Sequence, residues 1–204
     1  MIPDHSLFCY LSDMSLDLLY KISNAILPLP QAEWEALARC WTPVQYKRKT
    51  IMTAAGDVER SIYFVLSGAQ RLFSLEGDKE TTILFTYKGS FSGILDSFQL
   101  QRTTPYYLET LTESEFLRLS YADFYQLTEQ YPLLQKWARL GTVDAMAGVL
   151  ERYNELISYS AEKKFRTLLG RSPHVLQIIP HKYLASYLGI DPATFSKLLN
   201  TIKL

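Results

Sequence analysis

The segment HKYLASYLGIDPATFSKLL, residues 181–199, decides how the C-terminal part of this chain folds. Its apolar spacing predicts one short helix over 181–188 and a second over 192–199. Gly189 suits the left-handed position just past a helix end, and Pro192 fits the first position of the next helix. Such a pair is typical of a helix-turn-helix, which places its second helix in the major groove of DNA. A plain corner of two helices inside a core is the alternative.

The side chains that these two helices offer to DNA are few. The second helix begins with Pro192-Ala193, which brings no side-chain hydrogen bonds. Lys197 has the reach for guanine or a phosphate, and Asn200 has the groups that pair with adenine. His181 and Lys182 start the first helix and are expected to touch phosphate. The candidate DNA-binding residues are His181, Lys182, Thr194, Ser196, Lys197 and Asn200.

The distribution of charge agrees with a C-terminal contact to phosphate. The whole chain is neutral, with 21 basic and 21 acidic residues. Residues 151–204 carry 8 lysines and arginines against 4 acids, so this part has a net charge of +4 and the remainder is acidic. A basic end beside an acidic body favours nucleic-acid contact by that end alone. The excess is modest, and a pair of chains would double it.

Composition and cysteine content limit the class of protein and the cellular compartment that the sequence is expected to have. The 204 residues are 48% hydrophobic, enough for a substantial core, and contain no apolar run long enough to span a membrane. The N-terminal segment lacks the basic region of a signal peptide. Cys9 and Cys40 cannot build a disulfide framework, a zinc site or an iron–sulfur cluster by themselves. A reducing cytoplasm is therefore the expected location.

Enzyme and metal chemistry find no support in the residues. The sequence has no Ser/His/Asp order with supporting motifs, no paired histidines at metal spacing and no phosphate-binding glycine loop. His5, His174 and His181 are expected at surface or capping positions rather than as metal ligands. The sequence therefore predicts no catalytic residue, no metal site and no enzyme activity.

The middle of the chain has a different periodicity from its ends. Residues 1–40 look helical, whereas short runs rich in β-branched and aromatic residues fill 43–119. Turn signals such as Gly56-Asp57 and Lys88-Gly89 separate these runs. Several short strands at this spacing predict an antiparallel sandwich or barrel. The clearest predicted strands cover 61–66, 71–75, 81–86, 106–111 and 115–119.

A long helix is predicted over residues 132–158, after the β-type segment. Apolar residues recur along it with the three-four spacing of a coiled-coil seam. Asn154 lies on this seam and would fix the register between two like helices. A helix that packs only on its own β-domain is the alternative. The candidate dimer residues are Leu140, Val143, Ala147, Leu150, Asn154 and Ile157.

With this order of elements, the chain resembles the cyclic AMP receptor protein/FNR superfamily of bacterial transcription regulators, most closely its small members from Bacteroidetes-type bacteria. The resemblance spans about residues 34–200. The stretches that carry it are IYFVLSG (62–68) with RLF (71–73), GSFSG (89–93), LSYADF (119–124), AEKKF (161–165) and IPHKYLASYLGI (179–190).

The resemblance implies an α+β architecture in three parts. An antiparallel jelly-roll sensor domain with N-terminal helices would occupy residues 1–131, a dimerisation helix 132–158, and a helix-turn-helix domain 159–204. The implied partners are DNA and a second copy of the chain, with RNA polymerase as a further candidate. The β-hairpin wing that usually follows this motif is missing before Leu204. Its absence predicts a smaller interface and weaker, more salt-sensitive binding to DNA.

The sensor departs from the pattern of members that bind cyclic AMP. Those members have Gly-Glu after the turn for the ribose, and Arg-Ser about ten residues later for the phosphate. This chain has Gly93-Ile94 and Thr104-Pro105 at those places, so cyclic AMP is not the expected ligand. An unidentified small, partly apolar effector and a barrel filled by its own side chains both stay open, and no cofactor is assigned. The candidate pocket residues are Gly89, Phe91, Gly93, Ile94, Asp96, Arg102 and Thr104.

Two functions therefore remain. The first is a DNA-binding transcription regulator whose sensor barrel does not bind cyclic AMP, which the basic end and Lys197 favour. The second is a ligand-binding or protein-interaction module of the same fold with little affinity for DNA. The dipeptide Pro192-Ala193 and the missing wing favour this second reading.

Overall fold

Helices come first in the chain, and a β-sandwich follows them. The computed structural model describes residues 5–201, with side chains from residue 15 onward, so the side chains of His5 and Cys9 and the chain end at Leu204 lie outside it. Helices α1 (His5–Ile26) and α2 (Gln31–Arg39) agree with the helical character predicted for the N-terminal segment. The strands are β1 (Thr42–Tyr46), β2 (Ile51–Thr53), β3 (Ser61–Ser67), β4 (Ala69–Glu76), β5 (Lys79–Tyr87), β6 (Phe91–Ser92), β7 (Tyr107–Thr110) and β8 (Ser114–Ser120).

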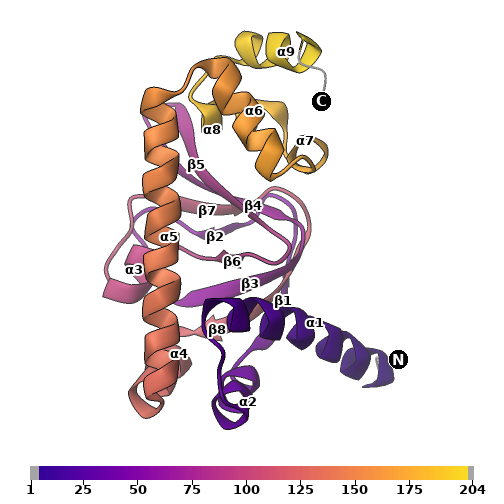
Figure 1. Ribbon diagram of the computed structural model, residues 1–204, viewed down its shortest axis with the longest axis vertical. Coiled ribbons are helices and arrows are strands. Elements are labelled where there is room, and N and C mark those ends of the chain that lie inside the picture. Colours follow the sequence, from indigo (N-terminus) through magenta and orange to yellow (C-terminus); the bar gives the residue numbers. More distant parts are fainter. Residues whose placement is uncertain (1–4, 202–204) are drawn as a thin grey trace.

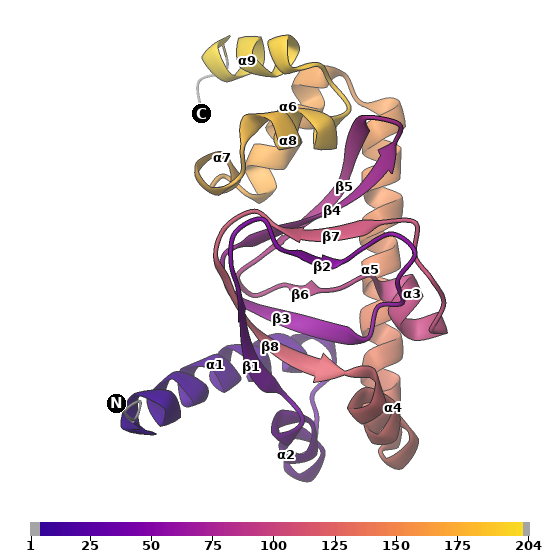
Figure 2. The ribbon, with the colours of Figure 1, turned by 180° about the vertical axis from the view of Figure 1, so that it is seen from behind.

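These strands form two four-stranded sheets that face each other (Figures 1 and 2). One sheet has the order β1-β8-β3-β6 and the other β2-β7-β4-β5, and the paired strands are antiparallel. This is the connectivity of a jelly roll, so the predicted antiparallel sandwich is confirmed. A short helix, α3 (Leu95–Leu100), lies between β6 and β7, where the sequence pattern predicts none.

The outer face of the first sheet is covered by helices. Strand β3 alternates, with Phe64 and its neighbours two residues away packing outward and Tyr63 and Val65 packing between the sheets. The helices that cover the outward residues are α1, α2, α4 (Tyr121–Gln130) and α5 (Pro132–Ser158). Trp137 of α5 is buried there, and its Nε1 donates to the carbonyl oxygen of Ser23 at 3.1 Å.

Helix α5 begins at Pro132 and ends at Ser158, as the sequence predicts. Its first half packs on the sandwich, while the second half reaches the C-terminal helices (Figure 1). Along this second half most of the apolar side chains are exposed. No helix in the described part of the chain is long and apolar enough to cross a membrane.

Four helices form the C-terminal unit: α6 (Ala161–Arg171), α7 (Val175–Ile178), α8 (His181–Leu188) and α9 (Pro192–Thr201). Gly189 has φ 62° in the left-handed region, and Asp191 accepts the backbone N–H of Thr194 at 2.9 Å. The predicted helix-turn-helix is thus present, with a second helix two residues longer than predicted. Phe165, Leu184 and Phe195 are buried in its core.

Candidate nucleic-acid interface and sensor pocket

The outward face of α9 presents two uncommitted polar side chains. Lys197 and Asn200 are exposed, and within the described part of the chain neither side chain has a hydrogen bond or an ion pair. The hydroxyl of Thr194 donates to Asp191 at 2.6 Å, and that of Ser196 donates to the carbonyl of Pro192 at 2.9 Å. Four of the candidate DNA-binding residues therefore share one helix, but two of their hydroxyls are engaged within it.

The other two candidates lie at the start of α8. His181 and Lys182 are both exposed there. The His181 ring lies 5.3 Å from that of Phe195 on α9, and the Lys182 ammonium lies 4.7 Å from the Tyr183 ring centroid. The start of a helix carries a partial positive charge and free N–H groups. These positions therefore suit contact with a phosphate backbone.

A buried arginine joins the C-terminal unit to the β-sandwich. The Arg71 side chain on β4 is 2% exposed, with Nε 2.8 Å from Glu109 Oε2 and Nη2 2.7 Å from Glu80 Oε2. Its guanidinium lies between the rings of Phe73 and Tyr183, 4.0 and 3.8 Å from their centroids. Because Tyr183 belongs to α8, this cage fastens the first helix of the helix-turn-helix to the second sheet.

A second cluster of charges joins the same unit to α5. Glu155 of α5 is 2% exposed and is paired with Arg152, 3.2 Å away, and with Arg171 of α6. Arg152 also donates to the carbonyl of Tyr187, and its guanidinium lies 3.8 Å from the Tyr187 ring centroid. On α8, Tyr187 in turn packs against Phe85 of β5, with the ring centroids 5.2 Å apart. The helix-turn-helix therefore contacts both the second sheet and helix α5.

Near the expected ligand position, the sandwich contains a cluster of the chain's own buried side chains. Ile94 is 1% exposed and packs with Leu72 and Leu108. Further along, Gln70 joins a buried network, donating to Ser114 Oγ at 2.9 Å and accepting from Thr86 Oγ1 at 3.0 Å. The apolar cluster offers no partner for a sugar or a phosphate.

The structure separates the seven candidate pocket residues. Ile94 and the buried Thr104 lie inside, and Gly89 and Gly93 form turns with φ 85° and 139°. Asp96 and Arg102 are half or more exposed and pair with each other at 3.7 Å, so they lie at the surface rather than beside Ile94.

The sequence predicts Phe91 in the ligand pocket, and the structure corrects this prediction. It packs on the outer face of the first sheet, with its ring centroid 5.3 Å from that of Phe64 and 5.7 Å from that of Trp137. In the pairing of β6 with β3, Phe91 lies opposite Phe64, and Ser92 lies opposite Tyr63. Ser92 therefore faces inward and Phe91 faces α5.

A carboxylate that no sequence motif indicates lies next to Ile94. Glu59 is 2% exposed and accepts from Thr53 Oγ1 at 2.9 Å, from Ser61 N at 3.2 Å and from Ile94 N at 3.4 Å. Desolvation raises its pKa above the ordinary value of 4.5, although these hydrogen bonds oppose the shift. The backbone donor at Ile94 is thus already taken by an acidic group of the chain itself.

The raised pKa of Glu59 predicts a pH dependence of stability. The folded chain holds this proton more tightly than the unfolded chain, so the free energy of unfolding falls as the pH rises from about 4.5 through the folded-state pKa. Glu59→Gln has no carboxyl group to titrate at this position. Its free energy of unfolding should therefore rise relative to that of the wild type as the pH increases over this range. Urea denaturation at a series of pH values measures this pH dependence of the free energy of unfolding. Glu76→Gln, at an exposed position, is the control. Parallel pH curves for Glu59→Gln and the wild type would contradict the assignment.

The comparisons with known proteins agree with this geometry. Residues 43–131 match the family model of the cyclic nucleotide-binding domain. No curated protein matches the sequence significantly. FixK2 from Bradyrhizobium japonicum is 14% identical with a TM-score of 0.70, covering 78% of this chain and 83% of its own. CLP from Xanthomonas campestris, described as a c-di-GMP responsive global regulator, is 18% identical with a TM-score of 0.61, covering 84% and 90%.

A third similar structure is described as a cyclic nucleotide-binding domain from Methylobacillus flagellatus. It is 16% identical with a TM-score of 0.62, and the match covers 72% of this chain and 84% of its own. The matched family model describes a binding domain. Residues 43–131 are therefore similar to a cyclic nucleotide-binding domain, and the chain shares the fold of FixK2 and CLP.

Proposed function

We propose that this chain is a cytoplasmic, homodimeric transcription regulator that binds DNA through α9. The observation that carries the proposal is the helix-turn-helix itself, with Lys197 and Asn200 exposed and uncommitted on its second helix. A lysine there can bind guanine O6/N7 or a phosphate, and an asparagine can pair with adenine. Contacts of His181 and Lys182 with phosphate would fix the position of the unit on the duplex.

The uncovered face of α5 supports the homodimer. Of the six candidate dimer residues, Val143, Leu150 and Ile157 are 51%, 57% and 66% exposed in the single chain. Met146, Val149 and Tyr153 extend the same apolar surface. A second α5 packed along this face would bury it, with the exposed Asn154 setting the register. Two helix-turn-helix units would then meet two half-sites of one operator.

The buried side chains around Ile94 support a sensor that does not bind cyclic AMP. The ribose acceptor and the arginine that this ligand needs are replaced by Ile94 and Thr104, and Thr104 Oγ1 already accepts from Tyr106 N at 3.1 Å. The Glu59 carboxylate next to Ile94 would also repel a nucleotide phosphate.

One observation favours the second function, a binding module with little affinity for DNA. The start of α9, where base contacts are usually made, presents Pro192 and Ala193, and the Thr194 and Ser196 hydroxyls are used within the helix. A measurement of DNA binding separates the two functions.

Replacing Lys197 by Ala should weaken operator binding about tenfold, because one base or phosphate contact contributes roughly 1–3 kcal/mol. A gel shift with the DNA upstream of the protein's own gene, at low and moderate salt, measures the change. Lys79→Ala, on the exposed β4–β5 hairpin, is the matched control and should bind like the wild type. Failure of the wild type to shift this DNA, or equal binding by Lys197→Ala, would favour the binding module.

A further inference from the structure

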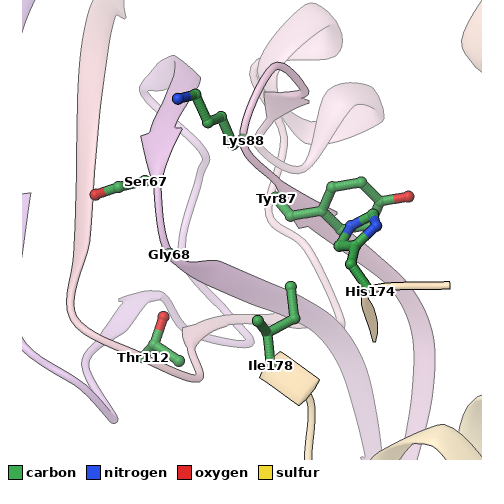
Figure 3. Close-up of a pocket in the computed structure, with 7 residues that line it drawn as sticks. All are labelled: Ser67, Gly68, Tyr87, Lys88, Thr112, His174 and Ile178. Atoms are coloured by element: carbon green, nitrogen blue, oxygen red, sulfur yellow. The ribbon is translucent and has the colours of Figure 1, made fainter. Parts of the chain in front are cut away.

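A pocket of about 330 Å³ lies outside the sandwich interior, where the sensor meets the C-terminal unit. The end of β3 contributes Ser67, with Gly68 after it, the end of β5 contributes Tyr87, with Lys88 after it, and the loop before β8 contributes Thr112. His174 and Ile178 close it from the α7 side. Figure 3 shows the Tyr87 and His174 rings against each other on one side, with Lys88 on the rim and Ile178 and Thr112 opposite it. Its volume is that of a site for a small organic molecule.

Most polar atoms that line this pocket are already satisfied by the chain. The Ser67 hydroxyl donates to Glu115 at 3.2 Å, and Thr112 Oγ1 accepts from the backbone N–H of Ala69 at 2.9 Å. The Tyr87 hydroxyl and the Ser172 hydroxyl are hydrogen-bonded at 2.5 Å. These walls therefore present aromatic rings, methyl groups and other carbon atoms to an occupant.

The two polar side chains of the pocket that lack a partner, Lys88 and His174, both favour an anionic ligand. Lys88 and His174 are both exposed, and within the described residues neither the Lys88 ammonium nor an imidazole nitrogen of His174 has a hydrogen bond or an ion pair with the chain. His174 is held by its ring contact alone, 4.7 Å from the Tyr87 ring centroid at an interplanar angle of 86°. A lysine and a histidine beside carbon-lined walls match a molecule with a negative group on a flat apolar body.

We propose that this pocket binds a small aromatic carboxylate, with its ring against Tyr87, His174 and Ile178 and its carboxylate on Lys88. The lining residues come from the β-sandwich and from the C-terminal unit. The hydrogen bond between the Tyr87 and Ser172 hydroxyls connects these two parts of the chain. A ligand here binds one arrangement of the two units better than another, so its binding is coupled to their docking. The consequence for DNA affinity rests on the proposed function, whereas the binding itself does not.

Binding of 4-fluorobenzoate, followed by ¹⁹F NMR on the full chain, tests the proposal. The wild type and Lys79→Met should bind the probe with similar affinity, whereas Lys88→Met should bind it up to about fivefold more weakly, because an ion pair with an exposed lysine is worth roughly 0.2–1 kcal/mol. His174→Leu provides an independent second variant with the same expected direction. The neutral 4-fluorobenzamide should bind more weakly than the acid to the wild type.

The proposal is overturned if the acid shows no saturable binding at millimolar concentration, if Lys88→Met binds it like the wild type, or if the neutral amide binds equally well. Gel shifts with and without the probe test the coupling separately. A wild type that binds the probe but no DNA removes the proposed function and leaves the pocket assignment intact. A changed DNA affinity in the presence of the probe supports the coupling, and an unchanged one overturns it.

Discussion

Arg71→Met should lower the free energy of unfolding by about 3–5 kcal/mol, because removing one partner of a buried ion pair leaves the other charge uncompensated. The Glu109 side chain, 8% exposed, would keep its charge while losing the bond from Arg71 Nε at 2.8 Å. The contact of Lys49 with Glu109, at 4.0 Å from a half-exposed ammonium, is too weak to replace it. The Tyr183 ring would lose the guanidinium on which it packs.

Urea denaturation of the wild type, Arg71→Met and Arg166→Met measures this effect. Arg166 forms an exposed pair with Glu162 at 2.9 Å, so its replacement should cost no more than about 0.5 kcal/mol. Adding Glu109→Met to Arg71→Met removes the orphaned charge and should recover part of the lost stability. Equal stabilities of Arg71→Met and Arg166→Met would show that the cage does not hold the two units together.

The parts of the fold that follow local rules are those that the sequence predicts well. The bounds of α5 come from Pro132 at the first helical position and from a steady apolar period up to Ser158. The turn at Gly189 is specified by a residue that reaches φ 62° without strain. In both cases the determining residues lie within a few positions of one another, so a single segment contains the information.

The contacts that build the site need information that no single segment holds. Strand β6 has only two residues, so its alternation is set by pairing with β3, and this pairing turns Phe91 outward. Arg71 is visible in the sequence as part of a strand, but its place between Phe73 and Tyr183 depends on how α8 docks. Glu59 precedes β3 in a turn-rich stretch typical of surface carboxylates, and it is buried by contacts with β2, with Ile94 and with α3 that come from distant parts of the sequence. Tertiary packing gives these residues their roles.

Leu150→Glu should abolish the dimer at micromolar concentration and, with it, high-affinity binding to DNA. Leu150 is 57% exposed in the single chain, so the substitution has little effect on the fold of the monomer. In the proposed seam the same position meets its copy on the partner helix. Each of the two chains would lose roughly 1.5–3 kcal/mol of apolar burial, and two carboxylates would face each other. The dissociation constant of the dimer should therefore rise about 100-fold or more.

The matched control for this substitution is Leu100→Glu on α3. Leu100 is 60% exposed, almost the same as Leu150, but it belongs to α3 and not to the proposed seam of α5, so the two variants differ in the seam and not in the exposure of the replaced side chain. Analytical ultracentrifugation should show Leu100→Glu as a dimer and Leu150→Glu as a monomer, with equal urea midpoints extrapolated to low protein concentration. A monomer contacts only one half-site of the operator. Leu150→Glu should therefore give no shifted band in the gel-shift experiment, although its α9 is unchanged. If both variants stay dimeric, the exposed face of α5 is not the interface, and the two DNA-binding units must be paired by another surface or act singly.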